Sequence, residues 1–79
     1  MEPKFGFGEL KKGMKARVSS VEGSRPDTVR LMELGLTPGT EFTVTKIAPL
    51  GDPIEISVRG YRLCLRRKES TDIRLELVE

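Results

Sequence analysis

The side chains that could do chemistry are few in this sequence, and the densest group is basic. Five cations fall within ten residues: Arg59, Arg62, Arg66, Arg67 and Lys68. The only cysteine, Cys64, lies among them, and the chain has no histidine. Ser-His and Cys-His nucleophile pairs and the usual Cys/His zinc sites are therefore excluded. A Gly-rich phosphate loop followed by Lys-Ser or Lys-Thr is also absent. We expect a protein that is not an enzyme, with no catalytic residue and no cofactor.

Metal ligands are also scarce. The candidate hard oxygen ligands are Asp52, Glu55, Glu69 and Asp72. Glu69 and Asp72 are three residues apart and would share a face of a short helical turn, but two carboxylates rarely suffice for a metal site. A single thiolate cannot hold a transition metal, so Cys64 is interpreted as a small residue on the outer face of a strand. We predict no metal ligands, and a metal-sensing module is kept as an alternative.

The composition is that of one small domain. The chain has 79 residues, of which 37% are hydrophobic and 33% charged, with a formal net charge of +2. A lone cysteine excludes an internal disulfide and favours a reducing, cytoplasmic compartment. No apolar run approaches the roughly 20 residues of a membrane helix, and the N-terminus lacks the apolar segment of a signal peptide. The small net charge does not by itself indicate a nucleic-acid partner.

Hydrophobic alternation predicts five short strands. They cover residues 14–21, 42–48, 54–58, 61–65 and 73–77. Val21, and the step between Lys46 and Ile47, break the alternation and indicate bulges. Arg59-Gly60 is the kind of pair that closes a two-residue hairpin. On the return strand, Tyr61, Leu63 and Leu65 are predicted to face inward, and Arg62, Cys64 and Arg66 outward.

One helix is predicted between the first two strands, at about residues 25–34. Ser24 is its predicted N-cap and Pro26 lies in its first turn. Gly35 is placed to end the helix in a left-handed conformation, with Leu36 completing a Schellman motif. Residues 37–40, Thr-Pro-Gly-Thr, fit a type II turn.

Five strands with phase slips favour a barrel, because closure removes exposed edges and bulges form the corners. We therefore predict a mainly β, small SH3-like (Src-homology-3-like) five-stranded barrel with an inserted helix. An OB-type barrel is the alternative. Residues 1–8 are predicted to form an N-terminal arm that docks through its aromatic side chains, and residues 9–79 to form the barrel domain.

Several segments together resemble the FeoA family of small proteins of ferrous iron transport. The most specific are LGLTPGT at residues 34–40 and APLGDP at residues 48–53, which leads into VRGY and LRR. The resemblance extends from about Leu10 to Val78. It implies an SH3-like barrel and a role alongside FeoB, a membrane GTPase that moves Fe(II). The same small barrel occurs at the C-terminus of iron-dependent repressors. Cys64 and the Phe-containing arm depart from the commoner FeoA pattern.

The resemblance and the arginine cluster together predict a cytoplasmic accessory protein that binds and modulates a FeoB-type transporter at the inner face of the membrane. The predicted contact residues are Pro49, Leu50, Gly51, Asp52, Pro53, Arg59, Arg62, Arg66 and Arg67. Nucleic-acid binding would require aromatic side chains for stacking beside the arginines. Only Tyr61 is near, and it is predicted to face inward, so a nucleic-acid-binding barrel is an alternative and not the expectation. No direct membrane insertion is expected, and a homodimer through strand edges stays open.

Overall fold

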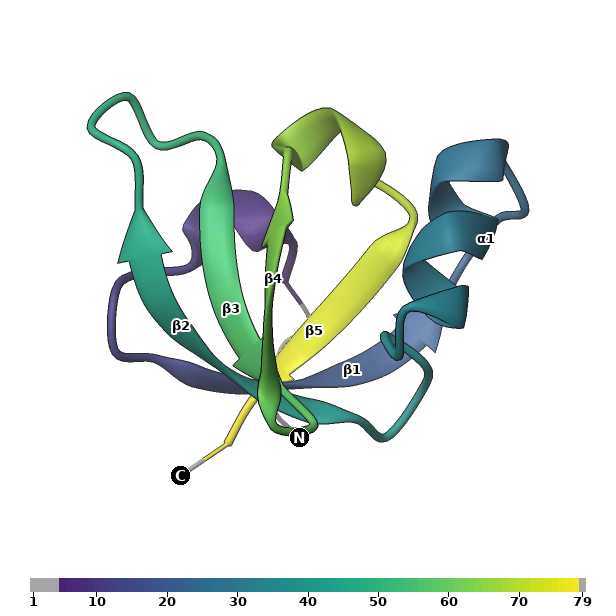
Figure 1. Cartoon of the computed structure of the whole chain (residues 1–79). Helices are drawn as coiled ribbons and strands as arrows, with labels where there is room; N and C mark the ends of the chain where they lie inside the picture. Colours follow the sequence, from purple (N-terminus) through teal and green to yellow (C-terminus); the bar gives the residue numbers. More distant parts are fainter. Residues whose placement is uncertain (1–4, 79) are drawn as a thin grey trace.

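The computed structural model describes residues 5–78, which form one strongly curved antiparallel sheet with a helix beside it (Figure 1). In chain order the elements are η1 (Phe7–Glu9), β1 (Lys15–Val21), α1 (Pro26–Glu33), β2 (Glu41–Ile47), β3 (Ile54–Val58), β4 (Tyr61–Leu65), η2 (Arg67–Glu69) and β5 (Ile73–Leu77), where η denotes a 3-10 turn. The strands lie in the order β4-β3-β2-β1-β5. The predicted five strands and single helix are therefore confirmed.

The alternating apolar residues of the strands form the core. β3 is the clearest case, because Ile54, Ile56 and Val58 are at most 1% exposed while the residues between them are partly exposed. The N-terminal segment adds to this core. Phe7 is 3% exposed and its ring stacks on Phe42, with centroids 5.6 Å apart. Docking of the arm through its aromatics is thus confirmed for Phe7, while residues 1–4 of the predicted arm lie outside the described residues.

Two irregularities in the strand pairing bend the sheet. The register between β1 and β5 shifts between Val18 and Ser20, and the register between β2 and β3 shifts between Val44 and Lys46. Both predicted bulges exist, but each lies earlier in its strand than the break in alternation indicated. Bulges increase local twist, which lets a five-stranded sheet curve around its own core.

The ends of α1 follow local chemistry. The predicted N-cap is wrong: Arg25, and not Ser24, precedes the first helical residue, with an extended backbone and no capping side chain. Pro26 occupies the first helical position and forces the residue before it out of the helical region, which fixes the boundary at Arg25. At the other end, Leu36 N donates to Leu31 O at 3.0 Å and Gly35 has a φ of +114°, which confirms the Schellman ending.

The predicted turns are also present. Thr40 N donates to Thr37 O at 3.0 Å, and Gly39 has a φ of +92°, as the third position of a type II turn requires. Arg59 and Gly60 have φ values of 50° and 85°, so a two-residue turn with two positive φ angles joins β3 to β4.

The predicted inward face of β4 is only partly correct. Leu65 is 1% exposed and Leu63 is half-buried, but Tyr61 is 40% exposed. β4 is the last strand of the sheet and has a neighbour only in β3. The inner side chains of β4 are therefore covered near Leu65 and left open near the hairpin. Tyr61 has the predicted inward parity, because it is opposite the buried Val58, but it is not buried.

Candidate interaction surface

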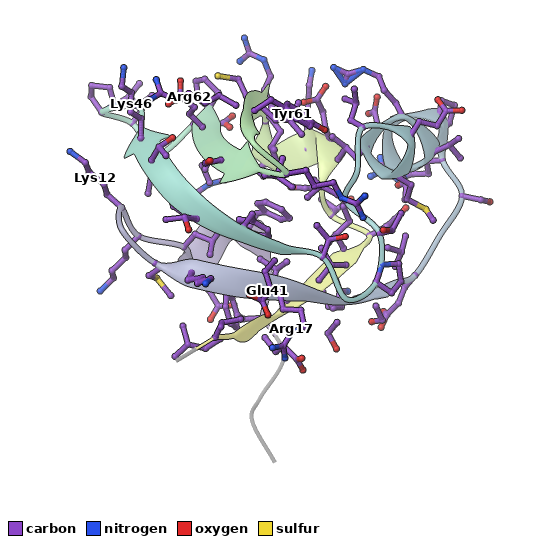
Figure 2. All side chains as sticks on the ribbon, turned by 60° about the horizontal axis from the view of Figure 1, so that its bottom comes forward. Lys12, Arg17, Glu41, Lys46, Tyr61 and Arg62 are labelled. Atoms are coloured by element: carbon purple, nitrogen blue, oxygen red, sulfur yellow. The ribbon has the colours of Figure 1, made fainter. Side chains whose placement is uncertain are left out.

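One face of the molecule has its charges neutralised. Arg17 on β1 lies within 2.8 Å of Glu76 on β5 and 3.0 Å of Glu41 on β2, and Lys15 lies 3.7 Å from Glu41. Hydrogen bonds with Glu76 and Glu41 raise the pKa of Arg17, and the Arg17 guanidinium lowers the pKa of Glu41. Figure 2 shows Arg17 and Glu41 close together on this face. A face whose charges are already paired offers little to a charged partner.

Three cations on the other side of the sheet make no ion pair with any of the residues that the structure describes. Figure 2 shows Lys46 and Arg62 on the opposite side of the molecule from Arg17 and Glu41. We call the exposed cations Lys46, Arg62 and Arg66 the cationic face; none of the three makes an ion pair with any residue in the range 5–78. Arg66 belongs to it because its backbone continues the extended conformation of β4, with a φ of −97° and a ψ of 149°.

Strand order explains the difference between the two faces. β1 lies between β2 and β5, and Arg17 is opposite Glu41 on one side and Glu76 on the other. β4 has a single neighbour, and there Arg62 is opposite Ser57, which carries no charge. Arg62 is thus left available to groups outside the chain.

The loop between β2 and β3 projects an apolar side chain. Gly51 N donates to Ala48 O at 2.7 Å, and Ala48 N donates to Pro53 O at 3.1 Å, so the loop is closed by its own backbone. Leu50 stands at its tip and is 96% exposed. A single exposed leucine is common on protein surfaces, but here it stands on a hydrogen-bonded loop and is accessible as an apolar contact.

The structure brings this loop together with one of the predicted arginines. Arg67 N donates to Asp52 Oδ1 at 3.0 Å. A β-carbon added at Gly51 would lie 2.8 Å from Arg67 Nη2, and one added at Gly8 would lie 3.7 Å from Arg67 Nη1. The Arg67 guanidinium therefore lies between two glycines, one from the loop and one from the N-terminal segment.

Arg59 lies elsewhere. The β3–β4 hairpin that carries it is at the opposite end of β4 from the β2–β3 loop (Figure 1). Its Nη2 donates to Thr40 Oγ1 at 3.2 Å, and a β-carbon at Gly35 would lie 3.4 Å from its Cδ and 3.2 Å from the Tyr61 hydroxyl. Of the predicted contact residues, Arg67 joins the loop, Arg62 is the second residue of β4, and Arg59 packs at the end of α1.

A shallow groove borders the cationic face. Its volume is ≈ 400 Å³. The lining residues are Lys12, Lys46, Ile47, Ala48, Pro49, Pro53, Glu55 and Cys64. The sequence analysis did not select the two lysines. The strand register is the signal that identifies Lys46 as a groove residue. Lys46 is opposite Glu55, and Glu55 is opposite Cys64, so the three side chains lie across adjacent strands. Cys64 itself is a free, exposed thiol, as expected for the outer face of β4.

The candidate metal-binding carboxylates each have a structural partner. Asp52 accepts from the Arg67 backbone, as described above, and Glu55 accepts from Thr45 Oγ1 at 2.7 Å. Glu69 accepts from Arg66 N at 2.9 Å and lies 3.6 Å from Arg30 Nη1. Within the described range 5–78, no three His, Cys, Asp or Glu side chains gather as a metal site would require.

Asp72 holds α1 against the corner that follows β4. Its Oδ2 accepts from Thr28 Oγ1 at 2.7 Å and from Arg25 Nε at 3.1 Å. Thr28 is fully buried, and its hydrogen bond, followed by that of Arg25, lowers the pKa of the Asp72 carboxyl. Asp72 is therefore a structural carboxylate in this chain.

None of the helices between residues 5 and 78 combines enough length with enough apolar character to span a bilayer.

Comparison with known proteins identifies clear relatives. The family profile described as FeoA domain matches residues 7–77. An "Fe(2+) transport protein A/Fe(2+) transporter FeoB fusion protein" of Porphyromonas gingivalis is 36% identical over 72 residues, which cover 91% of this chain and 8% of that protein. This chain thus corresponds to a small part of the fusion protein.

Solved structures agree in fold. A FeoA-like protein from Clostridium acetobutylicum superposes with a TM-score of 0.88 and 33% identity, over 100% of this chain and 92% of the other. Stenotrophomonas maltophilia FeoA, solved in complex with zinc and described as a prokaryotic SH3 domain protein, has a TM-score of 0.77 and 28% identity, over 91% and 89% of the two chains. The predicted SH3-like fold is therefore confirmed.

Proposed function

This chain belongs to the FeoA domain family, and on that basis we propose that it is a non-enzymatic accessory domain of ferrous iron transport that binds and modulates a FeoB-type transporter. The fused relative in Porphyromonas gingivalis carries this proposal, because its description places an Fe(2+) transport protein A and an FeoB transporter in one polypeptide. Fusion keeps two domains at a high effective concentration, which is useful when they work in contact. In the separate chain, a binding surface has to supply that contact.

The cationic face and the β2–β3 loop are the surface that we assign to this contact. Lys46, Arg62 and Arg66 have no intramolecular counter-ion among the described residues, so a partner's carboxylates would not have to displace one. Arginine is favoured at protein interfaces, and the exposed Leu50 adds an apolar anchor near the charges. In this proposal, the contact region of the transporter lies on the cytoplasmic side of the membrane, where a GTPase domain binds its nucleotide. The transporter then recruits this protein to the membrane.

A charge-reversal experiment tests the assignment. The variant Arg62→Glu/Arg66→Glu should bind the cytoplasmic domain of the FeoB-type transporter from the same organism at least about tenfold more weakly than the wild type by calorimetry. The matched control is Lys15→Glu/Arg30→Glu, which changes the net charge equally but acts on exposed cations outside the surface, each in an ion pair of small energetic value. Equal loss in both variants would show that net charge, and not this surface, governs binding.

Metal binding is the second candidate, and the zinc complex of Stenotrophomonas maltophilia FeoA is the observation in its favour. The four candidate carboxylates of this chain, Asp52, Glu55, Glu69 and Asp72, are already hydrogen-bonded, so a metal would have to compete with contacts that hold the fold. Anaerobic calorimetric titration with Fe(II) and Zn(II) distinguishes the two functions. Saturable binding at micromolar metal would favour metal binding over transporter binding as the function of this chain.

A further inference from the structure

The free edge of β4 is the feature that carries a further inference. In the β3–β4 hairpin, Val58 is opposite Tyr61, with a two-residue turn between them. The closing pair of such a hairpin exchanges both backbone hydrogen bonds, and the pattern then alternates. The amides and carbonyls of Tyr61, Leu63 and Leu65 therefore point to β3, while those of Arg62 and Cys64 point away from it.

Within residues 5–78, no strand occupies the side to which those groups point. β4 ends the sheet order, and no hydrogen bond joins the Arg62 or Cys64 backbone to any residue in the described range. Arg66, the next residue of the same parity, supports the assignment, because its N–H turns away from the ladder and donates to Glu69 Oε1 at 2.9 Å. The edge thus ends at Arg66, and the backbone groups of Arg62 and Cys64 form a short, open docking edge.

The side chains beside this edge are of two kinds. On the inner face, Tyr61 is 40% exposed and Leu63 is only half-buried, so apolar surface stays open to solvent next to the unpaired backbone. On the outer face, Arg62 has no counter-ion within the described residues. A strand added here would present alternate side chains to the two faces.

These observations favour one type of occupant. Pairing β4 with β4 of a second copy would bring two copies of Arg62 and Arg66 into neighbouring positions, and like charges across strands are destabilising. An acidic side chain opposite Arg62 would instead form an opposite-charge pair across the strands. Apolar side chains on the other face of the same segment would cover Tyr61 and Leu63.

We infer that β4 binds an extended segment of a partner protein, added as a further strand, in which acidic and apolar residues alternate. The acidic residues would pair with Arg62, and the apolar residues would complete the core where the inner face of β4 is open. Main-chain hydrogen bonds supply affinity in this kind of recognition, and alternate side chains supply specificity. The inference rests on the proposed function only in expecting the FeoB-type transporter to carry such a segment.

Amide hydrogen exchange by NMR tests the inference on the whole chain. The probe is a blocked ten-residue peptide that alternates glutamate and valine, compared with the same peptide carrying lysine in place of glutamate. The acidic peptide should slow exchange of the Arg62 and Cys64 amides at least about tenfold, because these gain partners on binding. The amides of Tyr61, Leu63 and Leu65 already bond β3 and should change little. The lysine peptide should leave the exchange rates of all five amides unchanged.

Proline substitution provides a second, independent test. Cys64→Pro removes an N–H that has no partner among residues 5–78 of the free protein, and an edge strand tolerates proline at such a position. Cys64→Pro should weaken binding of the acidic peptide at least about tenfold, whereas Cys64→Ala should bind as the wild type does. Leu63→Pro is the contrasting variant, because it removes a native β3–β4 hydrogen bond and should destabilise the fold.

Three results would overturn the inference: unchanged exchange at Arg62 and Cys64, equal binding of the lysine peptide, or full binding by a folded Cys64→Pro variant. If Cys64→Pro does not fold, the exchange measurement on the wild type decides alone. The same measurement with the transporter's cytoplasmic domain separates the two proposals. Binding without protection of these two amides would reject strand addition by the transporter and keep the proposed function. Absence of any binding would reject the proposed function, and the peptide measurements would then decide strand addition.

Discussion

Removal of the Phe7 ring is the sharpest test of how the segment before β1 belongs to the fold. Phe7 is 3% exposed and stacks on Phe42 with an interplanar angle of 5°. Truncation of a buried phenylalanine to alanine costs about 3–5 kcal/mol, and loss of a stacked partner is part of that cost. A domain of this size has a total stability of roughly 4–12 kcal/mol. Phe7→Ala should therefore lower the free energy of unfolding by a large fraction of its total.

Urea and thermal unfolding followed by circular dichroism measure the effect. At about 4–8 °C per kcal/mol, the Tm of Phe7→Ala should fall by more than about 10 °C. Phe5→Ala is the matched control, since Phe5 is only half-buried and its two backbone hydrogen bonds to Leu75, at 2.9 and 2.7 Å, survive the change. Phe5→Ala should lower the free energy of unfolding clearly less than Phe7→Ala does. If the free energy of unfolding of Phe7→Ala were within about 1 kcal/mol of the wild-type value, the conclusion that this segment is part of the core would be refuted.

Two further changes have defined outcomes. Asp72→Asn should lower the free energy of unfolding near neutral pH, because the folded-state pKa of Asp72 is lowered by Thr28 and Arg25. A lowered pKa stabilises the fold above the unfolded value of about 4 and loses that effect as the pH falls, so the gap between wild type and variant should shrink in acid; a gap that widens in acid would contradict this reasoning. Gly51→Ala should cost about 1–2 kcal/mol, because φ is +88° at Gly51 and the new β-carbon would meet Arg67 Nη2 at 2.8 Å. Stability of Gly51→Ala equal to that of the wild type in urea unfolding would show that the loop relaxes freely.

The strands, the helix and the turns could be predicted from the sequence, because their causes are local. Alternation in residues 54–58 and the positive-φ requirement at Gly35 and Gly39 act over a few neighbours in the chain. The N-cap was misplaced because two local signals competed. Ser24 is a good capping residue, but Pro26 fixes the first helical position, and the residue before a proline is extended.

The candidate surface could be predicted only in part. The outward parity of Arg62 follows from the alternation of β4, and the exposed loop follows from its prolines and glycine. Closeness between Arg67 and Gly51 could not be predicted, because it depends on how η2 folds back toward a loop 16 residues earlier in the chain. Exposure of Tyr61 was also missed, because parity gives the direction of a side chain and not whether another element covers it.

By itself, the sequence determined which segments are strands, where they turn, and that the chain lacks the histidine and paired cysteines of common reactive sites. Tertiary structure alone decided which cations are free. Arg17 and Arg62 both project outward from strands, but the strand of Arg17 has neighbours on two sides and finds Glu41 and Glu76, while the strand of Arg62 lies at an edge. Coulombic pairing acts over a few ångströms in space, so the order and register of the strands, and not their spacing along the chain, determine where charge is left for a partner.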